Sequence, residues 1–444
     1  MNLLNIYNKL PFIFIIFAFG PYVHLGLGLR LEHLLIYPFS LLFFMIFLLK
    51  KQFLIKNVFV LFSIWLVSAI FLITRTLLEG LSSEAFLGFV AEVESFIQPL
   101  AVMSAFLFLT IKFSENEAKS RIITACKVLI IMLSLNSMWS IINIFIDLSS
   151  INSYFWGSSD GSVASNAITN GRYSGIFNQP MEAGVMYSLG LFTWIYLSEN
   201  VNIFKLKYTV ALFLMIIGGL LTVSKVFLFG GLALFTLGVV FNKRIWKLVF
   251  SLTFWSLIIG VPAFYYLTKT WDGLNYLLRF FDSSNADFLY LITAGRFGAN
   301  AQQFGLFSGV WDTHPLIGTG FGKNPVYDSA FFYFFGNGGL IGLMFYLSIL
   351  VILSSLSLKF FVANKGNSES KFFIFIFLLV VGASFGTPIL TLNRVSVVLW
   401  VFIGLLVQYF YYSKVSSDVV LKEPIERGIK AKKKRRFKKY KLTW

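Results

Sequence analysis

The stretch Phe331-Phe-Tyr-Phe-Phe-Gly-Asn-Gly-Gly-Leu-Ile-Gly-Leu-Met-Phe-Tyr-Leu-Ser-Ile-Leu-Val-Ile-Leu-Ser-Ser-Leu356 carries no charged residue along its whole length. A bilayer-spanning helix needs about 20 mostly apolar residues, so this stretch by itself predicts a membrane span. The whole chain is 57% hydrophobic and 13% charged, with a mean hydropathy of +0.78. Soluble domains have a charged fraction of about a quarter. The sequence therefore predicts an all-α, polytopic membrane protein.

Similar apolar runs recur on both sides of this stretch, and they predict about twelve transmembrane helices. The first run is not followed by a small-residue cleavage site, so it is interpreted as an uncleaved span. The predicted spans are 10–29, 34–49, 57–74, 95–111, 122–146, 183–198, 208–223, 226–242, 248–267, 331–356, 372–390 and 395–413.

The basic residues orient these spans. With the N-terminus in the cytoplasm, 27 of the 37 Lys and Arg fall on the cytoplasmic side and nine on the other, as the positive-inside rule requires. The net charge of +17 is then a sign of orientation, and nucleic acid is not expected as a partner. The sequence predicts a transmembrane domain at 1–413 and a cytoplasmic polybasic tail at 414–444, which binds anionic headgroups or docks a cytoplasmic partner.

Two outer segments are long, 147–182 and 268–330. The second contains the polar interval Lys269–Asp328 and is expected to be partly helical, because its aromatic residues argue against disorder. Long loops of this kind are usually functional or disordered. The single cysteine, Cys126, lies in a predicted span, so no disulfide orders these loops.

Single cations stand beside the outer ends of several spans. Each alone has a plain explanation as a snorkelling or helix-terminal charge. As a group they predict a shared anionic ligand, because arginine donates two parallel hydrogen bonds to phosphate. The predicted ligands are Arg172, Lys225, Arg279, Arg296 and Arg394.

Four short patterns occur in order along the chain. They are Arg172-Tyr-Ser-Gly-Ile-Phe-Asn-Gln-Pro180, Leu221-Thr-Val-Ser-Lys225, the loop Arg296 followed by His314-Pro-Leu-Ile-Gly-Thr-Gly-Phe-Gly322, and Asp328-Ser-x9-Gly339-Leu-Ile-Gly342. In this order and in a twelve-span frame, they resemble the O-antigen polymerase (Wzy-type) and O-antigen ligase superfamily. The resemblance covers about residues 95–400. It implies a bacterial inner-membrane protein with both termini cytoplasmic and the two long loops periplasmic.

The resemblance implies a substrate of undecaprenyl pyrophosphate carrying an oligosaccharide repeat. The polymerase transfers the growing glycan to the terminal sugar hydroxyl of another lipid-linked repeat. The ligase transfers polymer to lipid A–core and carries a histidine where this chain has Asp328, so the departure favours the polymerase. An Arg-x10-Gly pattern found in some polymerases is not met. A chain-length regulator and a flippase are possible partners.

The reaction needs neutralisation of the diphosphate and a base near the acceptor hydroxyl. Asp328 is the first candidate for the base and His314 the second. Asp328 is alternatively a helix N-cap, and His314 alternatively a turn residue. Gly318, Gly320 and Gly322 either allow a tight turn or present amides to a diphosphate.

Neither a metal nor another cofactor is expected. The paired acids Glu92 and Glu94 point about 200° apart if they lie on a helix, although in an extended loop they could chelate together, and no Asp-x-Asp or His/Cys cluster occurs. From another functional class, the alternative is a flippase or transporter for the same lipid. Transporters place charges within spans and often have broken helices, whereas the spans predicted here are nearly free of charge.

Overall fold

The computed structural model of the chain describes residues 3–22, 30–50, 56–80, 83–107, 114–156, 163–202, 206–242, 246, 273, 302–322, 329–364, 366–392 and 394–413. Within these ranges the regular elements are helices, and the one β feature is an isolated bridge between Tyr22 and Arg30. The predicted span 248–267 and the tail 414–444 lie outside the described residues.

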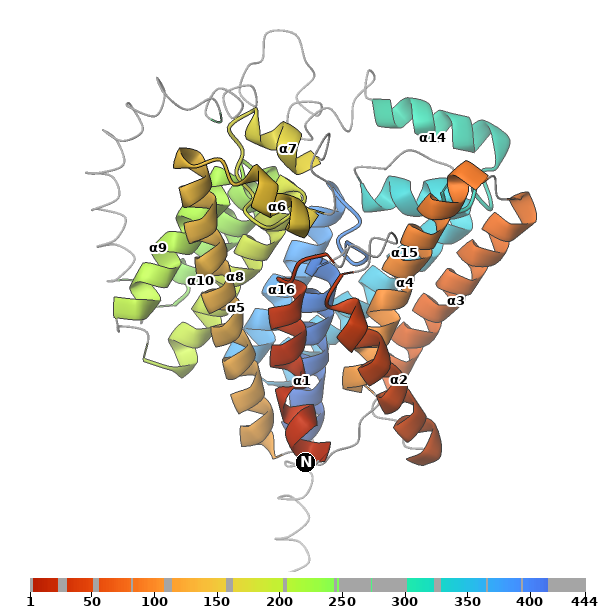
Figure 1. Cartoon of the computed structure of the whole chain (residues 1–444). Helices are drawn as coiled ribbons and strands as arrows, with labels where there is room; N and C mark the ends of the chain where they lie inside the picture. The colour runs from red at the N-terminus through yellow and green to blue at the C-terminus, as the bar shows by residue number, and fades with distance from the viewer. Residues whose placement is uncertain are drawn as a thin grey trace, which may run out of the picture.

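The helices follow one another in long up-and-down passes (Figure 1). They are α1 (Leu3–Ala18), α2 (His33–Lys50), α3 (Lys56–Glu79), α4 (Ser83–Leu107), α5 (Glu115–Phe145), α6 (Ser149–Trp156), α7 (Val163–Ile168), α8 (Pro180–Asn200), α9 (Leu206–Leu221), the π-helix η1 (Val226–Gly231), α10 (Leu232–Val240), α14 (Gln302–Thr313), α15 (Ala330–Ala363), α16 (Ser368–Ser384) and a terminal helix (Arg394–Ser413).

Local sequence explains several helix starts. Ser114 and Glu117 form a capping box at the start of α5, in which each side chain accepts from the other residue's backbone N–H, an arrangement that satisfies two otherwise unpaired donors. Pro180 occupies the first turn of α8, where its missing N–H costs nothing. Asn367 caps α16 by accepting from the Ser370 N–H.

The short helices α6, α7 and α14 gather at the end of the bundle opposite the N-terminus (Figure 1). We call this the loop end. The breaks between α3 and α4, between α9 and η1, and before α15 and the terminal helix lie at the same end. The polar motifs of the sequence are therefore collected on one face of the molecule.

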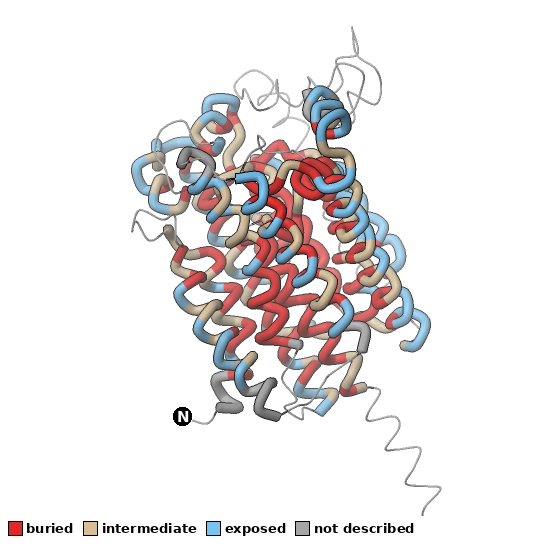
Figure 2. The backbone as a smooth tube through the Cα atoms, turned by 90° about the vertical axis from the view of Figure 1, so that its right-hand side faces the viewer, coloured by how far each residue is buried: buried red, intermediate tan, exposed pale blue. Residues whose placement is uncertain are grey.

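Two helices form the centre of the bundle. Nearly every residue of α8 is buried, and 89% of the terminal helix's apolar window is buried. The surrounding helices bury one face each, so that buried segments lie inside and exposed ones outside (Figure 2). A central helix that is apolar all round is typical of a membrane bundle or a large core.

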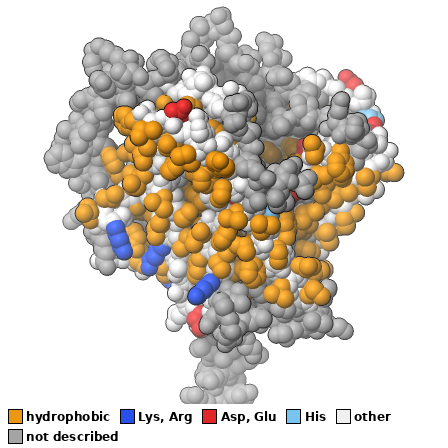
Figure 3. All heavy atoms as spheres, in the orientation of Figure 1, with side chains coloured by type: hydrophobic (Ala, Val, Ile, Leu, Met, Phe, Trp, Pro, Cys, Tyr) orange, Lys and Arg blue, Asp and Glu red, His pale blue; other side chains and the backbone are white. Residues whose placement is uncertain are grey.

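The outer surface is also apolar. Large hydrophobic side chains such as Ile70, Ile131, Phe213 and Val351 are exposed on α3, α5, α9 and α15. Hydrophobic side chains cover most of the described side wall in Figure 3, and the Lys and Arg side chains on that face lie toward the end that carries the N-terminus. Apolar patches of this extent are rare on soluble monomers.

Five described helices are long and apolar enough to cross a membrane, by length and composition. They are Phe59–Glu79, Phe86–Phe106, Glu115–Phe145, Ala330–Ala363 and Arg394–Ser413. Shorter apolar helices are Tyr7–Ala18, His33–Leu42, Leu206–Leu221 and Val226–Val240. The architecture is that of an all-α membrane-embedded protein.

Several predicted boundaries were wrong. The first helix ends at Ala18, well before residue 29, because the chain turns back there: the Gly20 N–H donates to Phe17 and Tyr22 pairs with Arg30. The interval 75–94, between the third and fourth predicted spans, is almost entirely helical, since α3 continues to Glu79 and α4 begins at Ser83. The helix α16 ends at Ser384, before residue 390.

The stretch 331–356 is not one continuous helix. Gly339, with φ 61° and ψ −154°, breaks α15. Beyond the break, the N–H groups of Leu340 and Ile341 donate to Pro315 O (2.8 Å) and Leu316 O (3.2 Å). The preceding loop thus supplies acceptors that the interrupted helix lacks, as buried backbone groups require.

Candidate functional site

Arg172 contacts the hairpin between α9 and η1. Its Nε donates to Thr222 O (3.1 Å), and one Nη lies 3.5 Å from Val223 O. The neighbouring Tyr173 N–H donates to Leu221 O (2.9 Å). The structure therefore brings together two segments that the sequence proposed as one site, although 50 residues separate Arg172 from Thr222. We call Arg172 and residues 222–225 the hairpin site.

The hairpin site is locally strained. Val223 has a φ of 45°, which is a true outlier for a β-branched residue. The turn is followed by the π-helix η1, an element that is rare and often found at functional sites. Strained residues persist only where their surroundings hold them, and they cluster at ligand sites.

Two further side chains of the hairpin are notable. Ser224 is buried, and its hydroxyl has no hydrogen-bond partner. It is pressed against α8, where a Cβ on Gly184 would lie 2.4 Å from the Ser224 oxygen. Lys225 is partly exposed, at the start of η1. A hairpin that carries an unpartnered buried hydroxyl and a lysine, and that an arginine contacts, has groups of the kinds that bind an oxygen-rich anion.

Arg394 has a different environment from Arg172. It is 2% exposed, and its guanidinium donates to three backbone carbonyls: Ile176 (2.5 Å), Gly20 (2.9 Å) and Phe155 (2.9 Å). These acceptors belong to three separate loop-end segments. The geometry favours a structural role for Arg394, as a tie between loops, and direct anion binding by this side chain stays an untested prediction.

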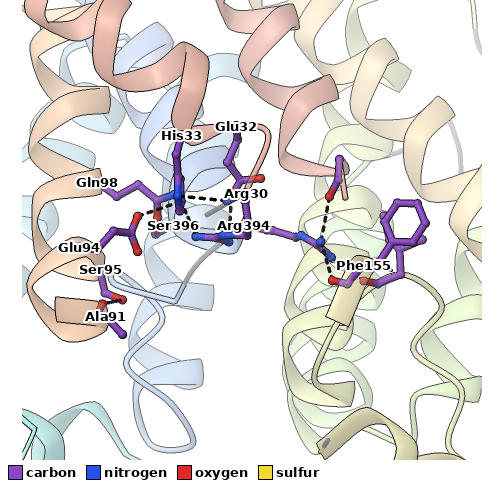
Figure 4. A network of polar contacts seen from close by, with 12 residues as sticks. Arg30, Glu32, His33, Ala91, Glu94, Ser95, Gln98, Phe155, Arg394 and Ser396 are labelled. Carbon is purple, nitrogen blue, oxygen red and sulfur yellow. Dashed lines mark hydrogen bonds and ion pairs between the residues drawn. The ribbon is translucent and has the colours of Figure 1, made fainter. Parts of the chain in front are cut away.

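Arg394 lies next to a set of ionisable and polar side chains, which we call the buried ionic cluster (Figure 4). Arg30 pairs with Glu32 (2.8 Å), and His33 Nε2 lies 2.9 Å from both Arg30 Nη2 and Glu94 Oε1. Burial raises the pKa of the Glu32 carboxyl, and Arg30 offsets part of this rise. The members of the cluster are Arg30, Glu32, His33, Glu94, Gln98, Arg394 and Ser396.

Sequence reasoning missed this cluster. The position of His33 beside the first predicted outer loop would make it an interfacial residue, but its side chain is only 3% exposed. A signal was present in Arg30-x-Glu32-His33, three ionisable residues directly before an apolar run. Charges next to a span are usually topological, and nothing in one sequence shows that Glu94 faces them.

His314 begins the loop 314–322, which we call the glycine loop. It is half-exposed, and its Nε2 lies 3.7 Å from Glu79 Oε1. Glu79 also pairs with the buried Arg75, whose Nε donates to Gly318 O (3.0 Å). His314 therefore lies in a turn and contacts Glu79 at the end of α3. No contact between His314 and Arg172 is found in the part of the chain that the structure describes.

The glycines of this loop make close backbone contacts. The N–H groups of Thr319 and Gly320 donate to Gly336 O and Asn337 O (3.0 and 2.9 Å), on the other side of the break in α15. At Gly318, with φ +63°, a Cβ would lie 2.5 Å from the backbone of Asn337. The amides of 319 and 320 are thus already paired, so the tight-turn interpretation fits better than diphosphate binding at these positions.

Glu92 and Glu94 lie on α4 and point to different partners. Glu92 accepts from the Gly322 N–H (3.1 Å), whereas Glu94 accepts from the Tyr37 hydroxyl (2.7 Å) and contacts His33. The outer segment that carried them in the sequence interpretation is helical. Among the described residues, no group of three His, Cys, Asp or Glu is arranged to hold a metal ion.

The remaining predicted site residues, Arg279, Arg296 and Asp328, lie outside the described residues, as does most of the loop 268–330. Their roles stay predictions. Within that loop, the described part contains the helix α14 and the glycine loop.

Comparisons with known proteins add no family assignment. No protein-family model matches the chain, and no curated protein matches it. The functional interpretation therefore depends on the residues and their geometry.

Proposed function

We propose that the chain is a membrane glycosyltransferase that polymerises lipid-linked oligosaccharide repeats. It transfers the growing glycan from undecaprenyl pyrophosphate to the terminal sugar hydroxyl of another repeat on the same carrier. The observation that carries the proposal is the contact between Arg172 and the hairpin 222–225 at the loop end. This contact joins an arginine to a hairpin that also carries Lys225 and the unpartnered hydroxyl of Ser224, at one end of an apolar bundle.

The chemistry demands little beyond this set of groups. The acceptor oxygen attacks the anomeric carbon, the bond from that carbon to the pyrophosphate oxygen breaks, and the acceptor proton passes to a base. The leaving pyrophosphate gains negative charge, which positioned cations stabilise. In this proposal Arg172 and Lys225 bind the diphosphate together with Arg279 and Arg296. Asp328 is the first candidate for the base and His314 the second.

Arg394 is given an indirect role. It binds Ile176 O, four residues from Arg172, and so holds the loop that carries the ligand. Because both of its Nη groups donate to loop carbonyls, its proposed contribution is to position this loop.

The proposed setting is the bacterial inner membrane. Twelve spans with both termini in the cytoplasm would put the loop end in the periplasm, where the flipped lipid-linked repeats are. The opposite end would carry the basic loops and the polybasic tail. A cysteine placed at the exposed Thr169 should be labelled by a membrane-impermeant reagent added outside intact spheroplasts, whereas labelling only after lysis would reverse this topology.

A second candidate, a flippase for the same lipid, has one specific observation in its favour. The helices carry more ionisable side chains than their sequences suggested, since His33 and Glu182 are buried and Glu94 is partly buried on helices, and α15 is broken at Gly339. Buried charges and broken helices are typical of transporters. The hairpin site favours the transferase, because transport alone does not require concentrated diphosphate ligands at one end.

Deletion of the gene and examination of the surface glycolipid separates the candidates. Loss of a polymerase leaves lipid A–core capped with a single repeat. Loss of the ligase leaves polymer on its carrier and none on core, and loss of a flippase strands single repeats on the inner face. Purified protein that lengthens synthetic lipid-linked repeats in detergent, where no transport is possible, would directly support the transferase.

A further inference from the structure

The two halves of α15 differ in what they expose, on either side of the break at Gly339. No residue from Ala330 to Gly339 is exposed. Beyond the break, exposed apolar side chains recur at helical spacing, which puts them on one face. Among them are Ile341, Met344, Leu347, Val351, Leu358 and Val362. The second half of α15 therefore has the apolar outer stripe of a lipid-facing helix, whereas the first half lies inside the protein.

The first half of α15 is covered by α14 and by the glycine loop that follows it. Phe307 of α14 packs on Phe332 and Phe335, with ring centroids 5.8 and 4.5 Å apart. The glycine loop lies directly beyond the end of the stripe, since Leu316 O accepts from the Ile341 N–H (3.2 Å). The loop thus takes the place on the outer surface that a continuous α15 would have occupied.

The outer side of the glycine loop is apolar. Leu316 is 61% exposed, and Ile317 is exposed as well. Isolated apolar side chains on a protein surface are normal, but these two adjoin the stripe that begins at Ile341. In Figure 3, hydrophobic side chains on the right-hand side reach up to the acidic and histidine side chains at the loop end. The apolar surface of the bundle therefore continues onto the loop.

The backbone of the glycine loop is paired as a membrane environment requires. Every N–H from Gly318 to Gly322 has an acceptor, and the first three donate to backbone carbonyls. The Phe321 N–H donates to Thr76 Oγ1 (2.7 Å), and the Gly322 N–H donates to Glu92 Oε2 (3.1 Å). At membrane depth, irregular backbone is tolerated only where the protein satisfies its polar groups. These five consecutive amides meet that condition.

We infer that the glycine loop lies within the membrane, with Leu316 and Ile317 against the lipid acyl chains of the leaflet at the loop end. The exposed polar residues Asp312 and Thr313 stand just before them, so the boundary between water and hydrocarbon crosses the chain near His314. The partner is bilayer lipid. The inference goes beyond the proposed transferase activity and does not depend on it.

The end of α3 marks the same boundary independently. Its last turn exposes Leu77 and Leu78 and finishes at Glu79, so this helix also changes from apolar to acidic at its outer end. Glu79 Oε1 lies 3.7 Å from His314 Nε2. The polar ends of the two apolar surfaces are therefore in contact, as expected if both reach the same membrane boundary.

The test measures the depth of the loop in lipid nanodiscs. In a Cys126→Ala background, a nitroxide is attached to Leu316→Cys or Ile317→Cys, and its collisions with dissolved oxygen and with a water-soluble nickel chelate are compared. The matched controls are Met344→Cys on the stripe and Thr313→Cys on the polar side. We expect the oxygen-to-nickel ratio at both loop positions to approach that at Met344 and to exceed that at Thr313 several-fold. Labels on the loop that meet the nickel chelate as often as the label at Thr313 would overturn the inference.

A second measurement uses the unsubstituted chain and so covers the case in which the cysteine variants do not fold. Lipids with a photoactivatable diazirine in the acyl chain are built into the nanodiscs, and the adducts are located by mass spectrometry. We expect adducts on residues 315–317 as well as on 341–351. Adducts on 341–351 with none on 315–317 would place the loop in water and contradict the inference.

Discussion

Arg172 and Arg394 lie at the same end of the bundle, and the sequence assigned both to one anion site, yet their environments differ. Arg172 is half-buried and rests on two carbonyls of a strained hairpin. Arg394 is fully enclosed and its two Nη groups donate to three carbonyls from three segments. The comparison teaches that two cations beside span ends can differ in role, because one lies half-buried against a hairpin and the other is enclosed among the segments that it joins.

The largest expected effect is on folding, from Arg394→Met. Three buried carbonyls would lose their donor, and each unsatisfied buried group costs about 1–3 kcal/mol. We expect loss of most folded protein, measured as the monodisperse fraction in detergent at fixed expression. Arg172→Met is the matched control and should still fold. Equal recovery of the two variants would remove the distinction drawn between these arginines.

The second effect is on activity, from Arg172→Ala. If Arg172 stabilises the leaving diphosphate, its removal should lower chain extension by about 10²–10³-fold, while the protein still inserts. Arg172→Lys keeps the charge without the planar fork and should retain part of the activity. Surface-glycan chain length on gels reports the result, and normal chains from Arg172→Ala would exclude the hairpin site as the diphosphate site.

The third effect is a smaller loss of stability, from Gly184→Ala. A Cβ there would lie 2.4 Å from Ser224 Oγ, so the hairpin must move, at a cost of about 1–3 kcal/mol. Gly382→Ala on α16 is the matched control, because nothing lies within 4 Å of its Cβ. Thermal unfolding in detergent should separate the pair, and no difference between them would show that the hairpin is loosely held.

The smallest stability effect is expected from Ser224→Ala. Its hydroxyl is buried without a partner, so removing it should change the unfolding free energy by less than about 1 kcal/mol, or raise it. If the hydroxyl binds the diphosphate, chain extension should nevertheless fall. Unchanged activity with unchanged stability would remove Ser224 from the hairpin site.

Much of the fold was predictable because membrane spans depend on local composition. Eleven of the twelve predicted spans overlap described helices, and 248–267 lies outside them. The ends of those helices were less predictable. The apolar run through residue 29 gave no sign that α1 stops at Ala18, because the stop depends on a backbone bridge between Tyr22 and Arg30.

The candidate site was predictable only in part. The association of Arg172 with Leu221–Lys225 followed from the position of both at outer span ends. The contacts of the two Arg394 Nη groups with three carbonyls and the amide pairing of the glycine loop did not follow, because their partners are backbone atoms that are remote in sequence. Backbone carbonyls and amides occur at nearly every position, so the order of residue types does not show which of them a side chain will contact.

The sequence by itself determined that this chain is a helical membrane protein with its polar motifs between spans, since apolar length and charge placement are local properties. Only the tertiary structure decided which of those polar residues are ligand candidates and which are internal ties. That decision depends on burial and on the partners of each donor. The buried ionic cluster is an example. It forms only in the folded bundle, which brings together His33 of α2, Glu94 of α4 and Arg394 of the terminal helix.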